Sequence, residues 1–138
     1  MSNLIRISMS LEKDLLHKLE QMISNSRYAN RSEYIRDLIR SRLVNNEWEE
    51  NREALGTITL VYNHHQRKLN EKLIDIQHDH HKLVLVSTHV HLDRHHCAEI
   101  VVVKGKARDI NALKDRLQRQ KGILHATLSM SSTAKKLA

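Results

Sequence analysis

The sequence predicts a mixed α+β protein in which a short βαα unit is followed by a βαββαβ unit. Two observations predict this class. One strand-like and two helix-like apolar periods occupy the first 44 positions, and a polar, acidic stretch over residues 45–53 separates them from a longer alternation of strand and helix patterns. We expect a domain over residues 1–48, a linker over 49–54, a second domain over 55–131 and a frayed tail over 132–138.

Composition points to an anionic partner and excludes several classes of protein. The 23 Lys and Arg outnumber the 16 Asp and Glu, which gives a net charge of +7 and favours nucleic acid. One Cys cannot form an internal disulfide, which favours a reducing compartment. The longest apolar runs are far too short to cross a bilayer, and the N-terminus lacks a signal-peptide pattern. We therefore expect a cytoplasmic protein with no membrane partner.

Aromatic residues are scarce, with no Phe, one Trp and three Tyr. The core must therefore be aliphatic. A single-strand nucleic-acid binder needs aromatic platforms on which bases stack, so the composition argues against that class.

The first predicted element is a strand over residues 4–10, because apolar and polar residues alternate there. Ile5, Ile7 and Met9 share one face, and Arg6, Ser8 and Ser10 share the other. A lone strand has no sheet partner within so short a unit. The simplest source of a second strand is another copy of the chain.

Two helices are predicted to follow this strand. The first carries an apolar stripe from Leu11 to Ile23, with Ser10 as its N-cap. The second begins at Asn30, which forms a capping-box pattern with Glu33. Its inward-facing residues are expected to be Ile35, Leu38, Ile39 and Leu43.

The second unit shows alternating strand and helix patterns. Strands are predicted over residues 55–62, 83–92, 97–103 (ended by Gly105) and 123–130, and helices over 66–76 and 107–120, the latter with Gly122 as its C-cap. This β-α-β-β-α-β order is that of the ferredoxin-like fold.

The first unit has the chemistry for reading double-stranded DNA. A two-stranded ribbon fits the major groove, where Arg6, Ser8 and Ser10 could reach base edges. The start of the second helix, at Asn30, Arg31 and Ser32, suits a phosphate because its backbone N–H groups are free and its dipole end is positive.

These features, with the run Arg-Ser-Glu-x-Ile-Arg-Asp over residues 31–37, resemble the ribbon-helix-helix DNA-binding family across residues 4 to about 44. The resemblance implies that two chains intertwine and place paired strands in the major groove. Relatives often have Gly in the inter-helix turn where this chain has Arg27 before Tyr28. If that position needs a positive φ, Arg27 is strained by on the order of 1 kcal/mol.

Histidine is concentrated in the second unit, where nine of the eleven lie between His64 and His96. His89 and His91 stand at i and i+2, on one face of a strand, and a turn near Asp93 brings Cys97 level with them. Two imidazoles and a thiolate need one more donor for a four-coordinate site. His78 is the candidate, with His80 and His81 as competitors. Such N₃S ligation fits Ni²⁺, Cu²⁺ or Zn²⁺ and does not suit Mg²⁺ or Ca²⁺.

Residues around these ligands have lesser predicted roles. Glu99 shares the strand face of Cys97 and is expected to accept a hydrogen bond from an imidazole N–H. His95 and His96, like His80 and His81, are expected to be exposed loop residues. A nucleophilic role for Cys97 is not favoured because no loop nearby could form an oxyanion site, so an enzyme is not expected.

The whole chain, from about Leu4 to Met130, resembles the nickel-responsive transcriptional regulators of the NikR family. The resemblance rests on the ribbon strand, the Asn-Arg-Ser-Glu helix start and the spacing His-x₁₀-His-x-His-x₅-Cys from His78 to Cys97. It also rests on the segments Tyr62–Arg67, Ile74–His78, Thr88–His91, Cys97–Ile100 and Lys104–Gly105.

This resemblance implies a homotetramer, a dimer of dimers in which ribbon-helix-helix dimers flank a central tetramer of ACT-type domains. His89, His91 and Cys97 of one chain and His78 of a neighbouring chain would bind one Ni²⁺ per chain in a near-planar site. The loaded protein would bind a palindromic operator and repress nickel-uptake genes.

The resemblance also implies two secondary features. A cation such as K⁺ would lie between the domains, held by Glu33 and Asp37. Arg67 matches a basic position near DNA, although the preceding Lys of some relatives is Gln66 here. The additional histidines, His80, His81, His95 and His96, leave open a secondary or relocated metal site.

Two other classes account for part of the sequence. A metal-storage or metal-carrier protein for Ni, Cu or Zn explains the histidines but gives the N-terminal ribbon no task. A regulator that senses a small molecule through an ACT domain explains the second unit but not its metal-preferring side chains. The sequence does not distinguish Ni from Cu, give the operator, or separate repression from activation.

Overall fold

A computed structural model describes residues 3–137 of the chain. They form two compact units, Met1–Arg40 and Ser41–Ala138. The first unit holds α1 (Lys13–Asn25) and the beginning of α2 (Arg31–Glu49), and the second holds the end of α2 and all four strands. Within residues 3–137 no helix is both long and apolar enough to cross a membrane.

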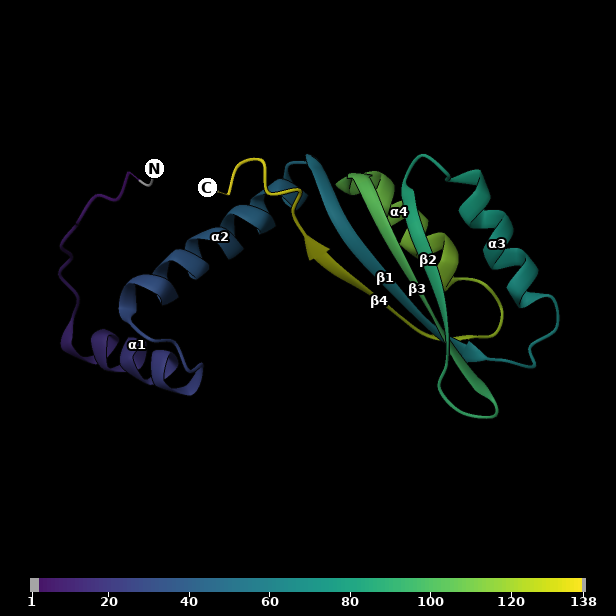
Figure 1. Cartoon of the computed structure of the whole chain (residues 1–138), viewed down its shortest axis with the longest axis horizontal. Coiled ribbons are helices and arrows are strands. Elements are labelled where there is room, and N and C mark those ends of the chain that lie inside the picture. The colour runs from purple at the N-terminus through teal and green to yellow at the C-terminus, as the bar shows by residue number, and fades with distance from the viewer. Residues whose placement is uncertain (1–2, 138) are drawn as a thin grey trace. The chain divides into compact units, whose positions relative to one another are not determined.

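Residues 3–12 precede α1 as an extended segment without a strand, as Figure 1 shows. The strand predicted over residues 4–10 is therefore not formed in a single chain. The reason is physical, because a strand is stable only when its backbone groups pair with another strand, and the first unit contains none. The apolar face of this segment is bare, with Ile5 84% and Ile7 78% exposed.

The caps of the two helices differ in how well the sequence predicted them. The N-cap of α1 is Glu12, whose side chain makes no capping hydrogen bond, so the prediction of Ser10 was wrong. The Asn30 cap of α2 is confirmed, because the Glu33 N–H donates to Asn30 Oδ1 at 3.0 Å. Between the helices Arg27 has φ 58°, the left-handed conformation in which Gly is favoured.

α2 runs without a break through residues 45–49, which the sequence predicted to be a polar junction. Trp48 explains this helical ending. Its indole is buried in the core of the second unit, and Nε1 donates to the Ser131 carbonyl at 2.9 Å. Gly56 makes room for it, because a Cβ at Gly56 would lie 3.2 Å from the Trp48 ring.

The second unit has the predicted βαββαβ order, which is confirmed. Its elements are β1 (Glu53–Asn63), α3 (Leu69–Asp79), β2 (Val84–His91), β3 (His96–Lys106), α4 (Ala107–Gln118) and β4 (Ile123–Ser131). The strands form one antiparallel sheet in the order β2-β3-β1-β4, with the two helices beside it (Figure 1).

Several element ends differ from prediction. α3 begins and ends three residues later than the predicted 66–76, because Gln66–Lys68 form a turn in which Lys68 is left-handed. β3 continues through Gly105 to Lys106. The C-cap of α4 is Arg119, not Gly122, which instead takes φ 103° in the turn before β4. The tail turns back rather than fraying, and Lys135 Nζ lies 3.1 Å from Glu53 Oε1.

One face of the sheet builds the core. Alternate residues of β1, among them Ile58, Leu60 and Tyr62, are buried against α3 and α4. The helices contribute Leu69, Leu73, Ile76, Ile110, Leu113 and Leu117. The core is thus almost wholly aliphatic, as the composition predicted.

The other sheet face has no helix over it in the described chain. The strand register aligns three cross-strand rows there: Val61–Ala98–Val90, Thr59–Ile100–Thr88 and Thr57–Val102–Val86. These side chains are small, β-branched and mostly apolar. A face of this composition is suited to burial against another layer.

Candidate metal centre

The β2–β3 hairpin sets the geometry of the candidate site. Its register places His91 opposite Cys97 and His89 opposite Glu99, on the helix-covered face. Asp93 holds the turn, because its Oδ1 accepts hydrogen bonds from the N–H groups of His95 at 2.8 Å and His96 at 2.9 Å. Those bonds, with one from the His96 ring, lower the pKa of Asp93 to about 2.

Four potential metal ligands converge beside this hairpin. Ligand atoms of His64, His89, His91 and Cys97 all lie within 4.8 Å of one another. Cys97 Sγ is 3.2 Å from His64 Nδ1 and 3.5 Å from His91 Nδ1. The structure therefore brings together three of the predicted ligands, His89, His91 and Cys97, and adds His64 as a fourth donor.

Sequence reasoning gave His64 no role. It follows the end of β1, and its N–H donates to the His95 carbonyl at 2.6 Å, which ties its loop to the hairpin turn. The pairing of Tyr62 with Cys97 in the β1–β3 register brings this loop to the thiol. That pairing is a tertiary contact, and only the closeness of His64 to a strand end could have suggested it.

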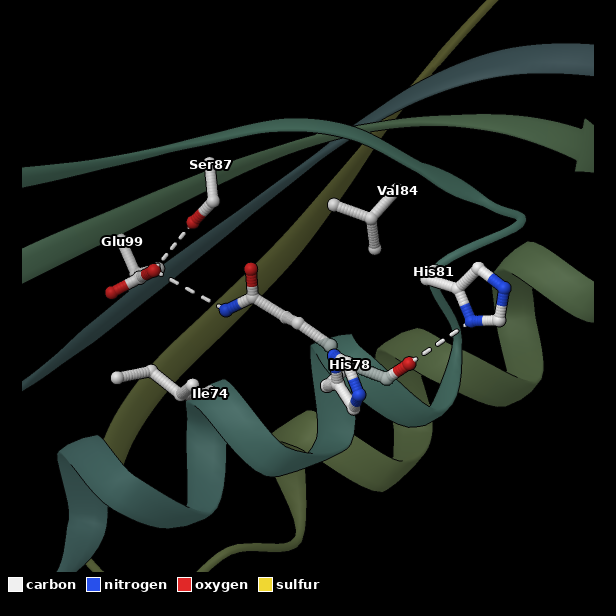
Figure 2. A pocket seen from close by; sticks show the side chains of 7 residues that line it. Ile74, His78, His81, Val84, Ser87 and Glu99 are labelled. Atoms are coloured by element: carbon white, nitrogen blue, oxygen red, sulfur yellow. Dashed lines mark hydrogen bonds between the residues drawn. The ribbon is translucent and has the colours of Figure 1, made fainter.

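His78 lies apart from the four donors in the same chain. It lines a hollow of about 340 Å³ between α3 and the β2 and β3 strands, together with His81 and Glu99 (Figure 2). Glu99 is at one end of this hollow and the two histidines are at the other. Of the predicted ligand set, His78 is thus the member that one chain does not bring to the thiol.

Glu99 organises the strand face beside the cluster. Its Oε1 accepts hydrogen bonds from Ser87 Oγ at 2.5 Å and from Gln77 Nε2 of α3 at 3.2 Å (Figure 2). Its Oε2 is 3.5 Å from His89 Nδ1, too long for a strong hydrogen bond. The direct contact predicted between Glu99 and an imidazole is therefore weak.

Tyr62 provides the shorter link to His89. Its hydroxyl lies 3.1 Å from His89 Nδ1 and 3.3 Å from Glu99 Oε2. Burial, then the nearby Glu99 charge, raises the pKa of Tyr62 far above its ordinary value of 10.0. A neutral Tyr62 can accept the Nδ1 proton of His89, which leaves Nε2 of that ring to bind a metal.

The donor set fits a borderline transition metal. Three imidazoles and one thiol are the ligands that Ni²⁺, Cu²⁺ and Zn²⁺ accept, and they are unsuited to Mg²⁺ or Ca²⁺. The Cys97 sulfur is buried and the three histidines are exposed. An ion would thus reach the cluster from the imidazole side.

The residues predicted to contact DNA are exposed in the single chain. Arg6, Ser8 and Ser10 lie on the extended segment, and Asn30, Arg31 and Ser32 surround the start of α2. Arg31 is engaged by Glu20, with Nε 2.6 Å from Oε1. Arg67 is exposed in the turn before α3.

Comparison with protein families matches both units. Residues 55–131 match the NikR C-terminal nickel-binding domain, and residues 5–45 match the ribbon-helix-helix proteins of the CopG family. The chain belongs to the NikR family of nickel-responsive regulators. As a NikR-family member it is a DNA-binding transcription regulator with a nickel-binding domain, and not an enzyme.

Relatives match over nearly the full chain. Proteins named as candidate nickel-responsive regulators are 46% identical over 138 residues in Nitratidesulfovibrio vulgaris (99% of each chain) and 47% over 132 residues in Desulfotalea psychrophila (96% of this chain, 97% of the relative). An uncharacterized Thermotoga maritima protein shares the fold, with a TM-score of 0.52 at 15% identity over 57% of this chain and 98% of its own.

Proposed function

We propose that this NikR-family protein represses nickel-uptake genes, and that nickel binding raises its affinity for a palindromic operator. The convergence of His89, His91 and Cys97 at one point of the nickel-binding domain is the observation that carries the proposal. A metal carrier would use the same donors. The ribbon-helix-helix match over residues 5–45 favours a regulator instead.

In this proposal each chain binds one Ni²⁺ through His89, His91 and Cys97, and His78 of a neighbouring chain completes a near-planar site. Nickel with imidazole and thiolate donors adopts planar geometry readily. His64, which stands 3.2 Å from the Cys97 sulfur, would hold the fourth position in the metal-free chain. Exposure of His64 and of His78 supports such an exchange, since either ring can move without disturbing the core.

The assembly is proposed to be a homotetramer, a dimer of dimers. The bare apolar residues before α1 would pair with those of a second copy and form the missing two-stranded ribbon. The uncovered face of the sheet would be buried against the sheet of another copy. Both surfaces are apolar and have no covering layer within the described chain.

The paired ribbon would read bases through Arg6, Ser8 and Ser10. Asn30, Arg31 and Ser32 would bind phosphates at the start of α2, which requires Arg31 to leave Glu20. Arg67 would add a further phosphate contact from the second unit. Because phosphates dominate affinity, operator binding should weaken as salt rises.

Nickel and DNA would be coupled through the subunit arrangement. An ion that takes ligands from two chains stabilises the arrangement in which all four are in reach. If that arrangement also aligns the two ribbons on one DNA face, each ligand strengthens the binding of the other.

A secondary K⁺ site at Glu33 and Asp37 remains part of the proposal. The two carboxylates line one hollow near the start of α2, and the Tyr28 hydroxyl donates to Asp37 Oδ2 at 2.6 Å. Arg36 and Arg40 line the same hollow and offset the negative charge. A cation there would therefore need further oxygen ligands from outside the first unit.

The test is operator binding with and without Ni²⁺. An operator is first selected from random DNA with the nickel-loaded protein, and affinities are then measured by fluorescence anisotropy. Wild type and the matched control His81→Ala should bind more tightly when Ni²⁺ is added, and Cys97→Ala should not respond. An equal nickel response in Cys97→Ala would refute the ligand assignment.

Two further readings separate the finer parts of this proposal. His78→Ala and His64→Ala distinguish the two candidate fourth ligands, since only loss of the true ligand removes the nickel response. A reporter gene under the operator distinguishes repression, in which nickel lowers expression, from activation. Nickel binding without any effect on DNA would instead favour the carrier.

A further inference from the structure

Two histidines outside the four-donor cluster stand on loops that are fixed to each other. The ring centroids of His65 and His95 are 5.5 Å apart. The bond from His64 N–H to the His95 carbonyl joins the two loops. Each loop is also held by its own side chain, because Asn63 accepts from the His65 N–H at 2.9 Å and Asp93 accepts from the His95 N–H at 2.8 Å.

Both rings have their nitrogen atoms available. Within residues 3–137 the structure gives neither His65 nor His95 a side-chain hydrogen bond, and both side chains are exposed. The rings of His80, His81 and His96 differ, because each has Nδ1 engaged by a nearby oxygen. The pair is therefore the best preorganised set of imidazoles outside the cluster.

We propose that His65 and His95 form an outer divalent transition-metal site that adjoins the four-donor cluster. Two imidazoles on fixed loops would bind Ni²⁺, Cu²⁺ or Zn²⁺, with water in the remaining positions. Two protein donors against four make this site the weaker of the two. Cu²⁺ should bind it most tightly, because imidazole affinity rises along the first-row metals to copper.

His64 lies between the outer site and the cluster. Its ring centroid is 5.2 Å from that of His65 and 5.4 Å from that of His91. Four imidazoles thus run in sequence from the hairpin turn to the Cys97 thiol. An ion held by the outer pair is one histidine away from the inner ligands, so the outer site also concentrates metal at the entrance of the cluster.

The test is a nickel titration of the full-length protein, followed by isothermal calorimetry and by the sulfur-to-nickel absorption band. Wild type should bind a second, weaker equivalent per chain that leaves this band unchanged. His65→Ala and His95→Ala should each lose the second equivalent and keep the first with its band. His96→Ala, a matched control on the same turn, should keep both, and Cu²⁺ should show the same pattern with tighter binding.

Three results would overturn the outer site. They are a single equivalent in wild type, a second equivalent that survives in the His65→Ala/His95→Ala double variant, and loss of the absorption band in either single variant. The proposed function fails differently, because there the wild-type protein shows no nickel effect on operator binding. The outer site stands or falls independently of that result, since Cys97→Ala should lose the band and retain the weaker equivalent.

Discussion

The two units of the chain differ in how completely each one buries its apolar residues. Among residues 3–40 only Ile23 and Tyr34 are buried, and large apolar side chains such as Ile5 and Ile7 are bare. In the second unit Ile110, Leu113 and Leu117 are fully buried beneath the sheet. One unit is thus an independent fold, and the other is half of one that a second copy would complete.

Leu113→Ala should produce the largest change in stability and confine it to the second unit. Leu113 is fully buried, so truncation leaves a cavity and lowers the free energy of unfolding by about 2–5 kcal/mol. Urea unfolding followed by the fluorescence of Trp48, the only Trp of the chain, measures it.

Leu38→Ala supplies the contrast from the first unit. Leu38 is 47% exposed in one chain, so its truncation should matter only where a second copy covers it. Its cost should therefore vary with protein concentration, whereas that of Leu113→Ala should be less sensitive to it. A concentration-independent loss in Leu38→Ala would remove the contrast between the units.

Ile7→Asp should break the first unit without harming the second. A charge on the apolar face of the ribbon would oppose pairing of two copies, and operator affinity should fall by roughly 100-fold or more. Nickel uptake by the second unit should persist. Ile7→Val is the control. Unchanged DNA affinity in Ile7→Asp, measured by anisotropy, would exclude a paired ribbon.

Tyr62→Phe tests how the second unit holds its metal ligands. Removing the hydroxyl takes away the 3.1 Å contact to His89 Nδ1, and nickel affinity should fall by about 10- to 100-fold. Tyr28→Phe, in the first unit, should leave nickel affinity unchanged. Equal nickel affinities in the two variants, measured by competition with a chelator, would exclude a role for Tyr62 in orienting the ligand.

Arg27→Gly should have the smallest effect and stabilise the first unit. With φ 58°, Arg27 is left-handed, and Gly should relieve on the order of 1 kcal/mol of strain. Thermal melting followed by circular dichroism would record a higher midpoint, and Arg27→Ala should give no such gain. A lower midpoint in Arg27→Gly would mean that the Arg27 side chain matters more than its backbone.

Local patterns predicted much of this molecule. The βαββαβ order follows from periodicity, and Asn30 capped α2 as its residue type indicates. The meeting of His89, His91 and Cys97 could be predicted because alternation on a strand and one tight turn are local features. Arg27 likewise showed the positive φ that its place between the helices required.

Long-range features could not be predicted in the same way. His64 and Tyr62 join the site only through the β1–β3 pairing, which residue spacing does not contain. Trp48 extends α2 because it packs in the core of the second unit, although its neighbours are polar. The predicted strand over residues 4–10 needs a partner strand, and a single chain supplies none.

The coupling of metal to DNA is tested most directly by measuring nickel affinity with and without operator DNA. Equilibrium linkage requires that the operator strengthen nickel binding by the same factor by which nickel strengthens operator binding. We predict equal factors in wild type and none in Cys97→Ala. A nickel affinity that the operator leaves unchanged would contradict the account.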